Sequence, residues 1–155
     1  MMCYNLILFF FIRDRSYLLY VIYIATYGMV QMAYNGMAFE YLWPHYPRWH
    51  NISLPFLIGL AILWMAIFTQ SFLHLWEKAR AMFWSMVAVM VIGVITMIYS
   101  VLGDYLTAIE SAMKVMVFAA VMTIVSAVVS MARGYRPARF FLMAWLFFLC
   151  GLVLI

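Results

Sequence analysis

The sequence predicts an all-α protein, a polytopic bundle of transmembrane helices, and three observations support that fold class. First, 70% of the 155 residues are hydrophobic and 9% are charged, whereas an ordinary soluble domain is roughly 45–50% apolar and about 25% charged. A soluble domain of this length leaves much of its surface in water, so it could not hide so much apolar surface. Second, apolar runs recur at the length that a membrane requires. Third, the basic residues are concentrated in alternate connections between those runs.

The apolar runs define five full spans and a partial first helix. A helix needs about 20 residues to cross about 30 Å of hydrocarbon at a rise of about 1.5 Å per residue. The predicted full spans are residues 17–38, 54–75, 82–102, 109–131 and 137–155. The run 1–12 would cover only about 18 Å as a helix, so we interpret it as one half of a truncated helix. We therefore expect residues 1–155 to form a single transmembrane domain that is a fragment of a larger one.

The basic residues set the expected orientation. One set of alternate connections carries seven of the nine Lys and Arg residues: Arg13, Arg15, Lys78, Arg80, Arg133, Arg136 and Arg139. The other set, with the helix end beside it, carries Arg48 and Lys114. Cytoplasmic loops are enriched in Lys and Arg, so the seven-residue set is predicted to face the cytoplasm. A net charge of +4 is also seen in nucleic-acid-binding proteins, but short basic clusters between apolar runs favour a topological role, and no nucleic acid is expected as a partner.

Polar residues recur along one face of the predicted helix 17–38. Tyr20, Tyr27, Gln31 and Tyr34 are seven, four and three residues apart, and Asn35 follows Gln31 by four, which places them on one side of a helix. Polar groups at membrane depth need partners because lipid offers none. One interpretation is a hydrated or ligand-sensing seam between helices. The other is ordinary interhelical hydrogen bonding.

The connection 39–53 is predicted to be a long loop along the outer headgroups. It is rich in aromatic residues and proline, including Trp43 and Pro44, and aromatic rings of this kind prefer the membrane interface. Asn51 or Ser53 is predicted to cap the next helix, with Pro55 in its first turn.

The same loop contains the side chains that would be needed for a metal site. Glu40, His45 and His50 lie within it, but their spacing matches no common ligand motif, and a zinc site requires three or four ligands in fixed geometry. We predict no metal and no cofactor. The sequence also contains no nucleophile–base motif, glycine-rich phosphate loop or carboxylate pair, so it does not predict an enzyme.

A stripe of small residues runs along the predicted helix 109–131. Its members alternate four and three residues apart: Ala112, Met116, Ala119, Thr123, Ser126 and Ser130. Small residues in this register let helix backbones approach closely, so the stripe predicts a packing face, with a homodimer through it left open. Near the outer end of this helix, Glu110 and Lys114 are four apart and can pair. No charged residue falls near a predicted midplane, which argues against an ion-coupled transporter.

The connection before the last span is predicted to be a tight cytoplasmic turn. Gly134 stands where a left-handed C-cap residue is wanted, and Pro137 can occupy the first turn of the following helix.

Several motifs in order resemble the membrane domain of bacterial seven-transmembrane receptors with diverse intracellular signalling modules (DISM receptors). The matching segments are residues 5–11, 13–20, 35–36, 41–44, 133–142 and 144–145. The resemblance implies seven helices, an extracytoplasmic sensory domain resembling a carbohydrate-binding jelly roll, and a cytoplasmic output module such as a histidine kinase or diguanylate cyclase. This sequence departs from that pattern, because part of the first helix, the seventh helix and both flanking domains are not in it.

These observations predict the sensing and relay region of a receptor in the bacterial inner membrane. Its partners would be the lipid bilayer, an unknown extracytoplasmic ligand and an output module outside this chain. The candidate structural or relay residues are Arg13, Asp14, Gln31, Asn35, Gly36, Trp43, Pro44, Gly134, Pro137 and Arg139. The alternative is a small integral-membrane transporter or transporter subunit, and a third hypothesis is a membrane enzyme with a metal site at the outer-loop histidines.

Overall fold

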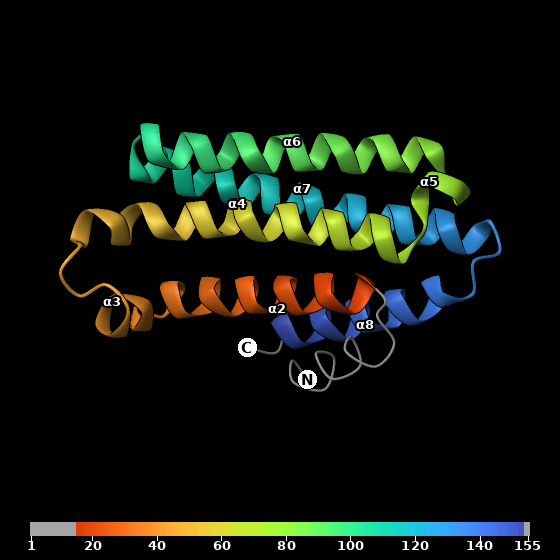
Figure 1. The fold of residues 1–155 in the computed structure, drawn as a ribbon, viewed down its shortest axis with the longest axis horizontal. Coiled ribbons are helices and arrows are strands. Elements are labelled where there is room, and N and C mark those ends of the chain that lie inside the picture. The colour runs from red at the N-terminus through yellow and green to blue at the C-terminus, as the bar shows by residue number, and fades with distance from the viewer. Residues whose placement is uncertain (1–14, 154–155) are drawn as a thin grey trace.

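The computed structural model describes residues 15–153 and confirms an all-helical bundle (Figure 1). Within that range there are seven helices and no strand. The helices are α2 (Arg15–Tyr34), α3 (Met37–Tyr41), α4 (Pro47–Phe72), α5 (Leu75–Lys78), α6 (Arg80–Leu102), α7 (Tyr105–Ala132) and α8 (Pro137–Val153). The predicted partial helix 1–12 lies outside the described residues.

Four of the helices are long and apolar enough to cross a membrane. They are α2 from Ser16 to Tyr34, α4, α6 and α7. The chain is therefore a multi-pass membrane protein. Helix α8 has 17 residues in its described range, so a complete crossing by residues 137–155 stays a prediction.

Helix α4 is the centre of the bundle. It packs against α2, α6 and α7, while α8 packs against α7. In Figure 1, α4 lies between α6 on one side and α2 on the other. Its buried face includes Ile58, Ile62 and Met65, none of which is more than 7% exposed. Because it touches three of the other long helices, a movement of α4 must disturb most of the packing in the molecule.

The backbones of α4 and α6 approach each other closely at two glycines, Gly59 and Gly93. A Cβ atom built on Gly59 would lie 2.9 Å from the carbonyl oxygen of Gly93 and 2.8 Å from Cγ of Met97. A Cβ on Gly93 would lie 3.2 Å from the carbonyl oxygen of Gly59. Glycine lets helix backbones approach within a membrane. The crossing of these two helices therefore depends on the absence of side chains at both positions.

The small-residue stripe on α7 is a packing face, as the sequence predicts. Its five small members are all buried: Ala112, Ala119, Thr123, Ser126 and Ser130. Met116 is 43% exposed, so its inclusion in the stripe is wrong. The stripe is already covered inside the chain, because α7 packs against α4, α6 and α8. A homodimer would need another surface.

The predicted helix 17–38 is interrupted, which is a correction to its end. Helix α2 stops at Tyr34, and the short α3 starts at Met37. Between them, Gly36 has φ of 76° and ψ of −10°. This is the left-handed region, which costs other L-residues roughly 1–2 kcal/mol. The Asn35-Gly36 pair therefore ends α2 and turns the chain into α3.

Alanine substitutions at two glycines of this region are predicted to change the stability of the protein in opposite directions. A Cβ on either Gly36 or Gly28 would meet nothing within 4 Å, so backbone conformation alone decides the outcome. We expect Gly36→Ala to destabilise the protein by about 1 kcal/mol because of the positive φ. Gly28 lies in the interior of α2, so Gly28→Ala is expected to stabilise by about 0.5–1 kcal/mol. Thermal midpoints in detergent measure both changes, and shifts of the same sign would contradict this explanation.

The loop predicted at 39–53 is mostly helical, which is a second correction. Helix α4 begins at Pro47, with Tyr46 as its N-cap residue, and runs through the whole segment in which its start was expected. Neither Asn51 nor Ser53 is a cap, and Pro55 lies inside the helix rather than in its first turn. Proline is favoured at the first position of a helix because it has no N–H to donate, and Pro47 already occupies that position.

The two ends of the bundle carry different charges. The α5 segment and the α7–α8 turn lie at one end in Figure 1, and α3 with the α6–α7 turn lies at the other. The first, here called the basic end, contains four arginines and one carboxylate among its described side chains: Arg80, Arg133, Arg136, Arg139 and Glu77. The opposite end has a mixed set: Glu40, Arg48, Asp104, Glu110 and Lys114. The basic connections of the sequence thus meet at one end of the molecule.

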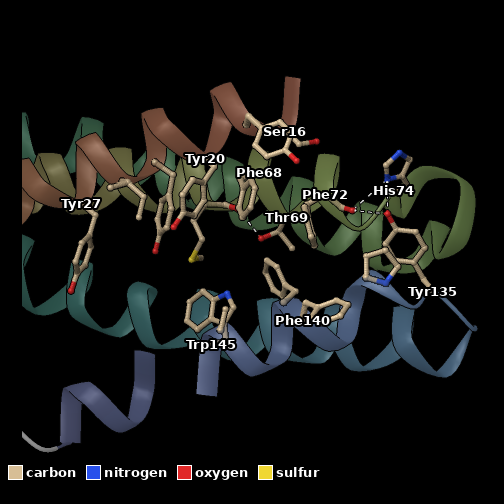
Figure 2. Close-up of a pocket in the computed structure, with 17 residues that line it drawn as sticks. Ser16, Tyr20, Tyr27, Phe68, Thr69, Phe72, His74, Tyr135, Phe140 and Trp145 are labelled. Atoms are coloured by element: carbon tan, nitrogen blue, oxygen red, sulfur yellow. Dashed lines mark hydrogen bonds between the residues drawn. The ribbon is translucent and has the colours of Figure 1, made fainter. Parts of the chain in front are cut away.

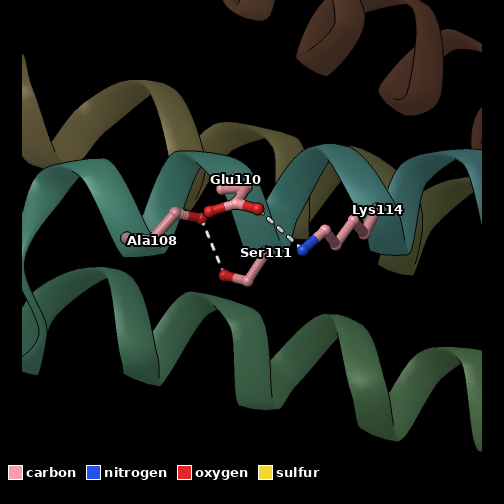
Figure 3. A network of polar contacts seen from close by, with 4 residues as sticks. All are labelled: Ala108, Glu110, Ser111 and Lys114. Carbon is pink, nitrogen blue, oxygen red and sulfur yellow. Dashed lines mark hydrogen bonds and ion pairs between the residues drawn. The ribbon is translucent and has the colours of Figure 1, made fainter.

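At the opposite end, Glu110 and Lys114 pair as predicted. Lys114 Nζ donates to Glu110 Oε1 at 2.7 Å, one turn apart on α7 (Figure 3). Both side chains are exposed, at 67% and 74%. The pair therefore lies on the outer surface of the bundle and not between helices.

Candidate functional site

A cavity of about 850 Å³ lies between α2, α4 and α8, toward the basic end. Its walls are mainly aromatic. Tyr20 and Tyr23 approach Phe68 of α4 with ring centroids 5.5 and 6.5 Å apart. Phe141 of α8 lies 6.1 Å from the same ring and 6.4 Å from that of Trp145. In Figure 2 the labelled rings surround the space between these helices.

Helical spacing explains how the sequence builds these walls. Tyr20, Tyr23 and Tyr27 follow one face of α2 at intervals of three and four, and the ridge of α4 opposite them carries Phe68 and Phe72. Residues three and four apart share a helix face. The polar face predicted from the sequence includes Tyr20 and Tyr27, but not Tyr23 or either phenylalanine. The spacing of those aromatic residues on the two helices was the signal that could have found them.

The predicted polar seam is only partly formed. Gln31 Nε2 donates to the Tyr27 hydroxyl at 2.8 Å, and Asn35 Nδ2 donates to the carbonyl oxygen of Gln31 at 2.9 Å. Both bonds lie within one stretch of chain, so they do not join α2 to another helix. Tyr34 is 74% exposed and does not line the cavity. The cavity therefore takes only the first part of the polar face, Tyr20 to Tyr27.

Side-chain hydrogen bonds between elements converge on the last turn of α4. At the start of α2, the Ser16 and Ser71 hydroxyls lie 3.4 Å apart. Gln70 Nε2 donates to the carbonyl oxygen of Phe83 on α6 at 3.2 Å. From the α7–α8 turn, the Tyr135 hydroxyl lies 3.2 Å from the carbonyl oxygen of Phe72. We call residues 70–74, which are the end of α4 and the two residues after it, the junction turn.

The Phe72 carbonyl is available because it lies at a helix end. The last four carbonyl groups of an α-helix have no partner within the helix, and Phe72 is the last residue of α4. The Tyr135 hydroxyl is also 3.3 Å from Nδ1 of His74, and the two rings are 5.8 Å apart. Figure 2 shows His74 and Tyr135 together at one end of the cavity.

His74 has a strained backbone. Its φ of 48° and ψ of 45° are left-handed, and among the described residues it is the one non-glycine with a positive φ. Such a conformation costs of order 1–3 kcal/mol and persists only where the surroundings enforce it. The neighbouring Leu73 and Leu75 are fully buried, and their packing fixes the path of the chain between α4 and α5.

A helix-ending motif positions Tyr135. Gly134 has φ of 86°, the left-handed conformation predicted from the sequence. The Tyr135 N–H donates to the carbonyl oxygen of Ser130 at 3.1 Å, and the Gly134 N–H donates to that of Met131 at 3.0 Å. These are the two bonds of a Schellman motif. The motif turns the chain so that Tyr135 reaches α4, and α8 then starts at Pro137.

The other candidate residues lie in two separate places. Pro137 lines the cavity, and Arg139 is exposed at the basic end. Trp43 is half-buried at the opposite end, with its ring 6.4 Å from that of Trp49 and with an indole N–H that is buried without a hydrogen bond. Pro44 beside it is exposed. Arg13 and Asp14 lie outside the described residues.

The outer-loop histidines have no metal-binding arrangement around them. Among residues 15–153, no three His, Cys, Asp or Glu side chains lie close enough together to hold a metal ion. The ring of His50 packs against Phe39, with centroids 4.8 Å apart. This contact gives His50 a packing role in the described structure.

Comparison with known proteins identifies a family for this architecture. The family described as "7TM diverse intracellular signalling" has a model that matches residues 1–155. Neither a curated protein nor a solved structure matches the chain.

Proposed function

The chain belongs to the 7TM diverse intracellular signalling family, and on that premise we propose that it is the sensing and relay region of a receptor in the bacterial inner membrane. The family is one of membrane sensory and signalling domains. The receptor receives an extracytoplasmic stimulus and passes it to a cytoplasmic output module of the histidine kinase or diguanylate cyclase type. The chain itself makes and breaks no covalent bond.

The junction turn is the observation that carries this proposal. A relay needs an element with two arrangements whose equilibrium the stimulus biases. The junction turn joins α4 to α2, α6 and the α7–α8 turn through side-chain hydrogen bonds. Each hydrogen bond contributes a net of about 0.5–1.5 kcal/mol. This is small enough for a stimulus to replace one set of hydrogen bonds at the junction turn with another. A shift of α4 thereby moves the α7–α8 turn and the α5 segment at the basic end.

The direction of the relay follows from the charges. Cytoplasmic loops are enriched in Lys and Arg, so we assign the basic end to the cytoplasm, where an output module lies. The opposite end, with α3 and the half-buried Trp43, then faces outward. Gly36, Trp43 and Pro44 would receive the stimulus, and Gly134, Pro137 and Arg139 would pass it on.

Removing one hydroxyl group tests the relay. We expect Tyr135→Phe to shift the basal output of the receptor by about fivefold in either direction, because loss of the hydroxyl's contacts with the Phe72 carbonyl and His74 Nδ1, at a net of about 1 kcal/mol, changes a two-state equilibrium by that factor. The ring of Tyr135 and its packing against the His74 ring remain, so the amount of protein in the membrane should be unchanged. The measurement is the kinase or cyclase activity of the chain joined to its output module.

Tyr34→Phe is the matched control. Its hydroxyl group is on an exposed residue outside the cavity, so output should stay at the level of the unmodified receptor. If Tyr135→Phe leaves both basal and stimulated output unchanged, the junction turn does not relay the signal.

Transport is the alternative function from another class. Among the described residues, the cavity lining contains no Asp, Glu, Lys or Arg side chain, and ion-coupled transporters normally use charged groups at membrane depth. Uptake of a solute by proteoliposomes that contain the chain would favour transport over the relay.

A further inference from the structure

We propose that the cavity between α2, α4 and α8 is a lipid-binding site that takes an acyl chain of an anionic phospholipid, with the headgroup at Arg136. The inference deepens the proposed function by naming a membrane ligand for the site next to the junction turn. It does not depend on signalling, because it concerns binding alone.

The shape and lining of the cavity suit an acyl chain. From Ser16 to Tyr27 the cavity follows three turns of α2, about 16 Å at a rise of about 1.5 Å per residue. Its volume of about 850 Å³ lies within the range of small-molecule sites, about 300–1,000 Å³. Its walls are aromatic rings and aliphatic side chains with few polar groups. An elongated apolar space of this kind favours a flexible hydrocarbon chain over a compact polar solute.

Charge complementarity at one end identifies the headgroup. Arg136 stands in the chain between two residues that line the cavity, Tyr135 and Pro137. It is exposed, and it forms no ion pair with another side chain in the described range. Guanidinium groups bind phosphate through paired hydrogen bonds. The phosphate of a bound lipid would lie at the level of the α7–α8 turn, while the acyl chain of the lipid extends toward Tyr27.

The headgroup must provide most of the selectivity. A lipid tail in the bilayer is already in an apolar solvent, so its transfer into an apolar cavity gains little from the hydrophobic effect. The discrimination between lipids therefore comes from charge at the mouth. Phosphatidylglycerol carries a net negative charge and phosphatidylcholine carries none, so the site should select the first over the second when their acyl chains are identical.

The bound lipid would also lie against the junction turn. His74, Tyr135, Phe72 and Ser16 form the end of the cavity nearest Arg136 (Figure 2). A phosphate that draws Arg136 toward the cavity would act on the same short turn that carries Tyr135. Occupancy of the cavity is thus coupled to the hydrogen bonds between the α7–α8 turn and α4.

Quenching of Trp145 fluorescence by brominated lipid measures this binding directly. The full chain is reconstituted in phosphatidylcholine bilayers with a small fraction of phosphatidylglycerol brominated midway along its acyl chains. Trp145 lines the cavity one to two turns beyond Phe140, at the depth that such bromine atoms reach. The signal from this residue is the difference between the unmodified chain and Trp145→Phe. We expect brominated phosphatidylglycerol to quench it at mole fractions several-fold lower than brominated phosphatidylcholine.

Two pairs of variants test the mouth and the cavity. Arg136→Gln should weaken the preference for phosphatidylglycerol by about fivefold, while Arg80→Gln, which removes a charge at the same end beside Trp76, should leave it unchanged. Ala144→Phe places a ring in the cavity and should abolish quenching of Trp145. Ala88→Phe, at an exposed alanine on α6 away from the cavity, should not.

Three results would overturn the proposal. Equal quenching by the two phospholipids would mean that the cavity does not select an anionic headgroup. An equal loss of selectivity in Arg80→Gln would assign the preference to the general charge of this end. Preferential quenching by a brominated free fatty acid would identify a different ligand. Each result concerns binding, so it leaves the Tyr135→Phe signalling test of the relay independent.

Discussion

Replacing Gly59 with leucine is expected to remove nearly all folded protein from the membrane. The first carbon of the new side chain would lie 2.9 Å from the carbonyl oxygen of Gly93, which is backbone and cannot rotate away. The two central helices would have to separate, and overpacking of this kind typically costs about 1–3 kcal/mol, occasionally more. Yield of monodisperse protein after detergent extraction, with the thermal midpoint of whatever remains, measures the effect.

A graded series distinguishes helix approach from a general intolerance of substitution. Gly59→Ala should lower the thermal midpoint more than Gly93→Ala, because the closest contact of the added Cβ is 2.8 Å in the first and 3.2 Å in the second. Gly28→Leu adds the same side chain as the severe variant where no atom lies within 4 Å. It should be tolerated. Equal damage from Gly28→Leu and Gly59→Leu would refute the role of the α4–α6 crossing.

Truncation of Phe141 to alanine is expected to destabilise the protein by about 3–5 kcal/mol. The side chain is 6% exposed, and its ring contacts Phe68, Phe72 and Trp145 at centroid distances of 6.1, 5.6 and 6.4 Å. It is therefore the aromatic bridge by which α8 reaches α4. Its removal leaves an empty volume that the helices can only partly close. Unfolding in a denaturing detergent series, followed by helical circular dichroism, measures the loss.

Phe147→Ala provides the control on the same helix. This ring is 78% exposed, so its removal should change stability by no more than about 0.5 kcal/mol. If the two variants unfold alike, the ring contacts of Phe141 do not hold α8 to the bundle.

The fold class follows from the sequence because the bilayer restricts the choices. A backbone in hydrocarbon must satisfy its own hydrogen bonds, so long apolar runs such as 82–102 could only be helices, and α6 begins two residues before that predicted start. The stripe on α7 was similarly readable, since small residues at intervals of three and four have few other uses in a membrane helix. The left-handed Gly134 was predictable from the end of one apolar run and the proline that starts the next.

Predictions failed where local signals competed. The hydrophobic run from Tyr17 continues through Gly36, and apolarity alone gave no reason to end the helix, although Asn35-Gly36 is a turn signal. At the start of α4, both Pro47 and Pro55 could begin a helix. The earlier one does so, and the ring contacts of Phe39 with His50 and of Trp49 with Phe56 hold the additional turns.

The cavity was harder to predict than the fold. It is made by side chains from three helices, and a single sequence does not reveal which helices are neighbours in space. Tyr135 contacts His74 across 61 positions of the chain, and no spacing rule links them. Gly59 and Gly93 were likewise visible only as isolated glycines in apolar runs. Each became interpretable once α4 and α6 were known to cross at that level.

The lengths of α4 and α7 have a consequence for the surrounding bilayer. With 26 and 28 residues, they measure about 39 and 42 Å at about 1.5 Å per residue, against a hydrocarbon thickness of about 30 Å. Both begin at the same end of the bundle, where their first three turns carry Arg48, Glu110 and Lys114. The extra length of both helices therefore lies in the headgroup layer. In a thicker membrane the hydrocarbon would cover more of both helices together, at a cost of a fraction of a kcal/mol per ångström of mismatch.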